Sequence, residues 1–121
     1  MSSSLLGLTF DCTEATTLAT FWSDVLGRSV DDGASTDFAS IGFGDDSQPA
    51  WFFVKVPEGK AVKNRCHPDL VASDREAEVR RLTMLGAKQV ADFDEGGHLW
   101  TTLLDPEGNE FDVITGHSDG N

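Results

Sequence analysis

Two short runs of the sequence carry side chains that could hold a metal ion or move a proton. His67 and Asp69 stand two residues apart in one run, and Glu110 and Asp112 flank Phe111 in the other. Side chains along a β-strand point to alternate faces, so each pair shares one face of its strand. If the two strands line one cleft, an imidazole and carboxylates converge, and this set suits a divalent cation such as zinc, nickel, manganese or iron(II). The sequence therefore predicts metal ligands at His67 and Asp112, with Glu110 and Asp112 as candidates for proton transfer.

The predicted metal site is one ligand short. A catalytic metal normally has three protein ligands and open positions. Glu110, Asp11 or a residue from a partner subunit would have to supply the third. Two metal-free alternatives stay open: His67 could be hydrogen-bonded in a polar cleft, and Asp112 could be a solvated or arginine-paired strand carboxylate.

Aromatic residues offer a second way to bind a ligand. Trp51 and Phe53 share one face of an apolar strand pattern, and Trp100 lies in the middle of another. Aromatic walls suit a planar or hydrophobic small molecule, although core packing is the default for most of these side chains. Lys63 and Arg65 precede the candidate histidine, and either could bind a ligand carboxylate or pair with an acidic neighbour.

The elements that must position these residues repeat along the chain. Gly27 and Gly86 lie 59 residues apart, and each ends a helical pattern that follows an apolar strand pattern. In both halves the spacing predicts a strand, a helix and then two or three strands, which is an α+β repeat. The helices begin at 13–14 and 73–74, and the expected strands are 5–11, 29–30, 36–43, 51–56, 66–72, 88–93, 98–104 and 109–115.

One domain built from two modules accounts for this pattern. Module one spans about 5–56, a linker spans 57–63, and module two spans about 64–115. The modules are joined in one domain because neither half could bury much core alone. His98 beside a turn and His117 in the polar, loose tail from Gly116 are expected to have surface roles.

Composition excludes several classes of protein. Twenty-one acidic residues against nine basic ones give a net charge of −12, which repels nucleic acid and anionic membranes. Cys12 and Cys66 are too few for a disulfide framework, so we expect reduced thiols. The longest apolar stretch, Ala50 to Val54, is too short to cross a bilayer, and the N-terminus lacks the pattern of a signal peptide. These features favour a cytoplasmic protein.

Three motifs carry a resemblance to a known family. They are FWSDVLG at 21–27, KNRCHPDL at 63–70 and WTTLLDPEGNEF at 100–111. In this order, on a repeated chain, they resemble the glyoxalase, bleomycin-resistance and extradiol-dioxygenase superfamily, also called the vicinal oxygen chelate fold. The resemblance covers about residues 5–115 and is closest to glyoxalase-like domains of small bacterial proteins.

The resemblance implies a fold and a set of ligand positions. It implies two tandem βαβββ modules whose mixed sheets curl around a shared cleft, and it implies frequent homodimers. Members with a metal place ligands on the first strand of each module and on the last strand, which here correspond to Gly7, His67 and Asp112. The chain departs from that pattern at Gly7, because glycine has no side chain to donate.

Three functions are compatible with these observations. The first, which we favour slightly, is a metal-free protein that binds a drug or metabolite in its cleft, as the bleomycin-resistance relatives do. The second is a lyase, isomerase or dioxygenase that uses one divalent metal ion and acts on a substrate with vicinal oxygens. The third is a structural or regulatory partner domain, which predicts no deep pocket. One fold hosts many chemistries, so the resemblance alone does not choose among them.

Overall fold

The computed structural model describes residues 2–45 and 47–115, so His117 and the tail from Gly116 lie outside the described residues. The chain divides into two compact units, Met1–Lys60 and Ala61–Asn121, and this boundary falls within the segment expected to be the linker. No helix in the described part of the chain is long and apolar enough to cross a membrane. The shared cleft, the homodimer and the cytoplasmic location stay predictions.

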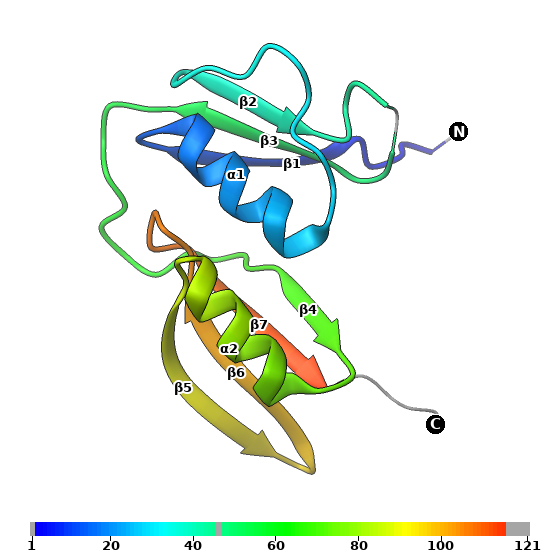
Figure 1. Ribbon diagram of the computed structural model, residues 1–121, viewed down its shortest axis with the longest axis vertical. Helices are drawn as coiled ribbons and strands as arrows, with labels where there is room; N and C mark the ends of the chain where they lie inside the picture. Colours follow the sequence, from blue (N-terminus) through cyan, green and yellow to red (C-terminus); the bar gives the residue numbers. More distant parts are fainter. Residues whose placement is uncertain (1, 46, 116–121) are drawn as a thin grey trace. The chain divides into compact units, whose positions relative to one another are not determined.

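The first unit is a three-stranded mixed sheet with a helix across one face (Figure 1). Its elements are β1 (Gly7–Cys12), α1 (Ala15–Leu26), β2 (Phe38–Ile41) and β3 (Ala50–Lys55). The strand order is β1-β3-β2, with β1 parallel and β2 antiparallel to the central β3.

Capping residues set the ends of α1 where the sequence predicts them. The Glu14 carboxylate accepts hydrogen bonds from the backbone N–H groups of Thr16 (3.0 Å) and Thr17 (3.2 Å), which have no partner within the helix. The same contacts, led by the hydrogen bond from the Thr17 hydroxyl, hold the pKa of Glu14 below its ordinary value. Gly27 ends the helix in the left-handed region at φ 66°.

An aromatic cluster forms the core beneath α1. The rings of Trp22 and Trp51 have centroids 5.0 Å apart, and Phe10 stacks on Trp51 at 5.4 Å. Phe53 is fully buried, and Trp51 is 6% exposed. The helix therefore covers the face of β3 that carries Trp51 and Phe53, and it leaves uncovered the face that carries Phe52.

The strand expected at 29–30 is reduced to a single bridge between Val30 and Ile41. Asp31 turns the chain there: its carboxylate accepts hydrogen bonds from the Ser40 hydroxyl (2.7 Å) and from the backbone N–H of Phe43 (2.9 Å). The expected βαβββ order is therefore complete only in the second unit.

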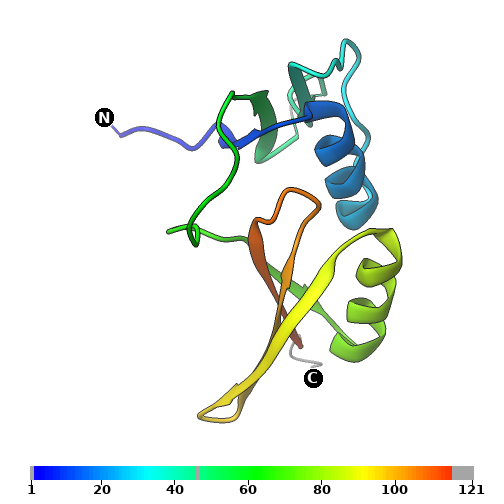
Figure 2. The same ribbon diagram turned by 90° about the vertical axis from the view of Figure 1, so that its left-hand side faces the viewer.

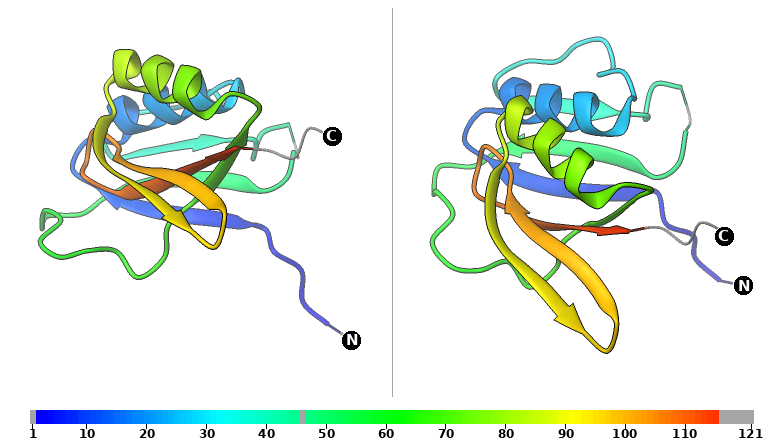
Figure 3. Two further views of the ribbon diagram at one scale, coloured as in Figure 1. Left: turned by 90° about the horizontal axis from the view of Figure 1, so that it is seen from below. Right: turned by 60° about the horizontal axis from the view of Figure 1, so that its bottom comes forward.

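The second unit places a helix on one face of a four-stranded sheet (Figure 3). Its elements are β4 (Asp69–Ala72), α2 (Arg75–Leu85), β5 (Lys88–Glu95), β6 (His98–Leu104) and β7 (Glu110–Thr115). The strand order is β4-β7-β6-β5, with β4 parallel to β7 and the other pairs antiparallel. The hairpin of β5 and β6, drawn in yellow to orange, extends beyond the end of α2 (Figure 2).

The helix-covered face of this sheet holds the core of the second unit. Leu82 of α2 is fully buried with Leu103 of β6 and with Phe111 and Val113 of β7. Because side chains alternate along a strand, the residues between these positions lie on the helix-free face. The α+β fold of two modules is therefore confirmed, with β4 beginning at Asp69 rather than at 66, since Pro68 has no N–H to donate to a sheet.

Gly7 is predicted to be required by packing. A Cβ added to Gly7 would collide with the carbonyl oxygen of Ala50 and lie 2.9 Å from its carbonyl carbon, both parts of the backbone of β3. Gly7→Ala should lower the free energy of unfolding by about 1–3 kcal/mol, measured by urea denaturation and tryptophan fluorescence. Gly59→Ala is the matched control, because nothing lies within 4 Å of its added Cβ. Equal stability of the two variants would contradict the packing argument.

The Asp31 turn predicts a loss of stability in acid. Burial raises the pKa of Asp31, but hydrogen bonds from Ser40 and from the backbone of residues 42–44 outweigh it and hold the pKa below 3.8. The ionised carboxylate therefore stabilises the fold above that pH, and the contribution is lost as the pH falls through the lower, folded-state pKa. Asp31→Ala should cost about 1–3 kcal/mol at pH 7 and progressively less below pH ~3.8 in urea denaturation. The exposed neighbour Asp32, replaced by Ala, is the control, and a pH-independent deficit in Asp31→Ala would refute this prediction.

Candidate functional site

Three side chains converge on the helix-free face of the second unit. The imidazole Nδ1 of His67 lies 3.3 Å from Oδ1 of Asp69 and 3.7 Å from Oδ2 of Asp112. One potential ligand atom from each residue lies within 4.8 Å of the others. The side chain of Asp112 is 15% exposed and that of Asp69 is 55% exposed, so the cluster opens to solvent on the Asp69 side.

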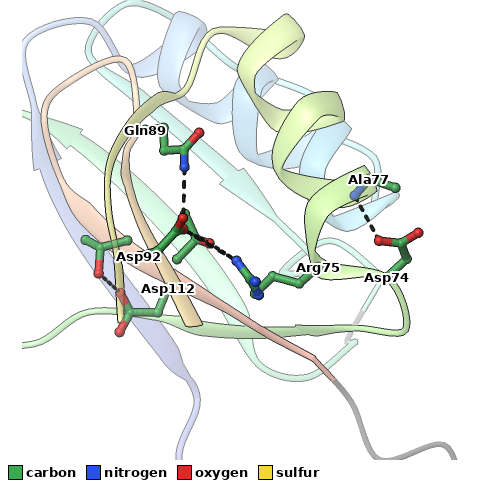
Figure 4. Close-up of polar contacts among 8 residues, drawn as sticks. Asp74, Arg75, Ala77, Gln89, Asp92 and Asp112 are labelled. Atoms are coloured by element: carbon green, nitrogen blue, oxygen red, sulfur yellow. Dashed lines mark hydrogen bonds and ion pairs between the residues drawn. The ribbon is translucent and has the colours of Figure 1, made fainter. Parts of the chain in front are cut away.

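Backbone pairing brings the two carboxylates together. Asp69 and Asp112 are direct partners in the parallel register of β4 and β7. The backbone N–H of Asp112 donates to the carbonyl oxygen of Pro68 at 3.0 Å, which joins the start of β4 to the middle of β7. The hydroxyl of Thr102 donates to Oδ1 of Asp112 at 2.6 Å (Figure 4), so the other oxygen, Oδ2, is the one near His67.

A turn with two buried polar residues, Asp105 and Asn109, holds the segment that leads into His67. Asp105 accepts hydrogen bonds at Oδ1 from the backbone N–H groups of Glu107 and Asn109, both at 2.9 Å. The side-chain amide of Asn64 donates to Oδ1 of Asn109 at 2.8 Å, and its backbone N–H donates to Oε1 of Glu110 at 3.1 Å. The turn after β6 thus anchors the chain three residues before His67.

The geometry of the cluster fits a divalent cation. Zinc ligands lie about 2.0–2.2 Å from the metal, so two ligands of a tetrahedral ion lie about 3.4 Å from each other. The His67–Asp69 and His67–Asp112 separations of 3.3 and 3.7 Å agree with that spacing. One nitrogen and two carboxylate oxygens are ligands that zinc, manganese and iron(II) accept, and three protein ligands leave positions open for a small molecule.

Asp69 is the member of the cluster that the sequence analysis did not name as a ligand. The signal was present, because strand alternation already placed Asp69 on the face of His67. Of the alternatives considered for a third ligand, Asp11 is exposed on β1 in the first unit, and Glu110 accepts a hydrogen bond from the backbone N–H of Asn64.

The other predicted site residues are not members of this cluster. Trp51 and Phe53 are in the core beneath α1, so their rings offer almost no surface to a ligand. Arg65 is exposed in the segment before His67. Trp100 lies on the helix-free face of β6, half-buried, and stacks on Phe93 with ring centroids 5.2 Å apart.

A second polar cluster lies on the opposite face of the same sheet. Arg75, at the start of α2, donates through Nη1 to the Thr101 hydroxyl (2.5 Å) and lies 3.4 Å from Oδ1 of Asp92 (Figure 4). The Thr101 hydroxyl also donates to Oδ1 of Asp92 at 2.7 Å. These contacts tie the helix to β5 and β6, and we assign them a structural role.

The sequence and the fold were compared with known proteins. The family model described as "Glyoxalase-like domain" matches residues 7–114. A comparison with curated proteins finds no match.

Solved structures match over nearly the whole chain. A glyoxalase/bleomycin resistance protein/dioxygenase family enzyme from Burkholderia phytofirmans PsJN has a TM-score of 0.72 and 18% identity, covering 93% of this chain and 98% of its own. A mutant fosfomycin resistance protein from Listeria monocytogenes, complexed with Mn(II) and a dihydroxypropylphosphonic acid, has a TM-score of 0.76 and 9% identity, covering 94% and 90%. A lactoylglutathione lyase from Agrobacterium tumefaciens has a TM-score of 0.66 and 14% identity, covering 96% of both chains.

At these identities the structural matches establish the fold alone, whereas the family model covers residues 7–114, which include residues of both units and of each strand in the described part of the chain. The chain therefore belongs to the glyoxalase-like domain family, within the glyoxalase/bleomycin resistance/dioxygenase superfamily.

Proposed function

We propose that the protein binds a divalent cation through His67, Asp69 and Asp112, and that this cation holds a small organic ligand. The observation that supports the proposal is the direct pairing of two aspartates in adjacent strands, with an imidazole nitrogen within 3.7 Å of both carboxylates. The cation would supply positive charge and open coordination positions, and the protein residues would orient it.

Electrostatics favours a cation at this position. Like charges directly opposite each other in neighbouring strands destabilise a sheet by some tenths of a kcal/mol to about 1 kcal/mol. The net charge of −12 adds to the negative potential around the pair. A bound cation would relieve this repulsion, and the exposed side of Asp69 gives it a route from solvent.

A second candidate function is catalysis at the same cation. Glu110 lies on the same face of β7 as Asp112, two residues before it along the strand, and its Oε1 accepts a hydrogen bond from the backbone N–H of Asn64. A carboxylate held at that place could take a proton from a ligand whose oxygens are on the cation. The enzyme would then be a lyase, isomerase or dioxygenase. Consumption of a bound ligand by the wild type, but not by Glu110→Gln, would favour catalysis over binding alone.

The proposal predicts one cation site per chain. Mn(II) is the first probe, because it is the ion present in the Listeria protein complex. Isothermal titration of the metal-free protein with MnCl₂ should give one site, and His67→Ala or Asp112→Asn should weaken it by at least about tenfold. His98→Ala is the matched control, because His98 is exposed at the start of β6 and outside the cluster. A wild-type protein that binds neither Mn(II) nor Zn(II) at millimolar concentration would refute the proposal.

Asp69→Asn should separate stability from cation binding. Without metal, this change removes one of two opposed charges and keeps an oxygen near His67, so the free energy of unfolding should stay equal or rise by about 0.2–1 kcal/mol. With 1 mM MnCl₂ the wild type should gain stability that the variant does not, because only a ligand of the native state stabilises it. Urea denaturation with and without MnCl₂ measures both effects.

Asp94→Asn, in the exposed end of β5, is the control for the change in net charge. Metal-free Asp69→Asn that loses more than about 1 kcal/mol would show that Asp69 has a structural role instead.

A further inference from the structure

The helix-free face of the second unit carries two neighbouring rows of side chains that cross the strands. The first is polar and runs through Asp69, Asp112 and Thr102, which are paired across β4, β7 and β6. We call it the polar row. It contains both carboxylates of the cation site, and His67 lies beside it.

The second row is apolar and crosses all four strands. Val71 pairs with Ile114, Ile114 with Trp100, and Trp100 with Phe93, so the row runs from β4 through β7 and β6 to β5. We call it the apolar row. Each of its members on β4, β7 and β6 stands two residues along its strand from a member of the polar row.

The apolar row is accessible rather than part of the core. Val71 is 72% exposed and Phe93 is 40% exposed, whereas Ile114 and Trp100 are half-buried. The rings of Phe93 and Trp100 lie nearly parallel, with an interplanar angle of 18°. Large apolar side chains gathered on an accessible face are typical of a binding surface.

The distance between the rows sets the size of a molecule that could use both. Two residues along a strand span about 7 Å. A molecule with an oxygen on the cation would therefore meet Ile114 about 7 Å away, which is the length of two fused six-membered rings. Trp100, one strand further across at a spacing of about 4.8 Å, lies about 8 Å away, and Phe93 lies beyond Trp100 on β5. A ligand of two or three carbon atoms would be too short to reach the apolar row.

We propose that the ligand joins an oxygen-donating, chelating head to a flat apolar body, with the head on the cation and the body on the apolar row. This inference rests on the cation site proposed above and names the class of ligand for it. Flat bodies are favoured because Trp100, which stacks on Phe93 and pairs with Ile114, places an aromatic ring in the part of the apolar row nearer the cation. An anionic body is disfavoured by the carboxylates of the neighbouring row.

Two probes with one head and different bodies test the inference. Acetohydroxamic acid and 2-naphthohydroxamic acid chelate a metal through the same two oxygens, but only the second carries a flat body of the required length. Isothermal titration of the Mn(II)-loaded protein should show at least about tenfold tighter binding of the naphthyl compound. Trp100→Ala should reduce that ratio at least about threefold by weakening the naphthyl compound alone. Phe93→Ala, which removes the ring that stacks on Trp100, should reduce the ratio by a smaller factor.

Leu99→Ala is the matched control. Leu99 is next to Trp100 on β6, is 43% exposed, and points to the opposite face, so this variant should keep the wild-type ratio. Phe93→Ala still tests the inference if Trp100→Ala does not fold, because the Phe93 side chain is the more exposed of the two and its loss should disturb the fold less. Mn(II) binding with equal affinity for the two probes, or a ratio unchanged in both Trp100→Ala and Phe93→Ala, would overturn this inference and leave the cation site standing. Absence of Mn(II) binding by the wild type would overturn both.

Discussion

The parallel pairing of β4 with β7 is the constraint on which the site depends. It sets Asp69 beside Asp112, although two carboxylates at neighbouring positions repel each other. The core on the other face enforces this register, because Val113 is fully buried and pairs with Leu70. A slip of one residue would turn Asp112 into the core and Val113 into water, at a cost of several kcal/mol. The buried side chains under α2 therefore keep Asp69 and Asp112 side by side on the opposite face, although their carboxylates repel each other.

The turn between β6 and β7 gives the imidazole its place. His67 precedes β4, so no sheet hydrogen bond of its own determines its position. Asn64 instead donates hydrogen bonds to Asn109 and Glu110, and the carbonyl oxygen of Pro68 accepts one from the backbone N–H of Asp112. The chain on both sides of His67 is therefore hydrogen-bonded to β7 or to the turn before it. Buried Asp105 holds that turn through Glu107 and Asn109. The DPEGN segment is thus a support for the site, although its own side chains do not belong to the cluster.

The sequence was sufficient to predict the features of the fold that depend on neighbouring residues alone. The helix start at 13–14, the stop at Gly27 and the opposite faces of Phe111 and Asp112 follow from local helix signals and alternation, and they were confirmed. The sequence was not sufficient to predict the features that depend on tertiary contacts. Alternation separates Trp51 from Phe52 but does not say which face a helix will cover, and α1 covers the face of Trp51. The first unit has no strand at 29–30 because the Asp31 carboxylate takes up the N–H of Phe43, a contact twelve residues away in sequence.

Packing at Gly7 leaves β1 without a side chain at the position where the family resemblance predicts a metal ligand. A side chain at that position would collide with the backbone of Ala50, so β1 cannot present a ligand there while it stays paired with β3. Close pairing of β1 and β3 brings Phe10 onto Trp51, and a ligating residue at position 7 would have to give up part of that contact. In the second unit the equivalent constraint is absent, because Asp69 is at the edge of the sheet and open to solvent. In the proposed cation site, Asp69, the second residue after the histidine, takes the place that Gly7 cannot fill.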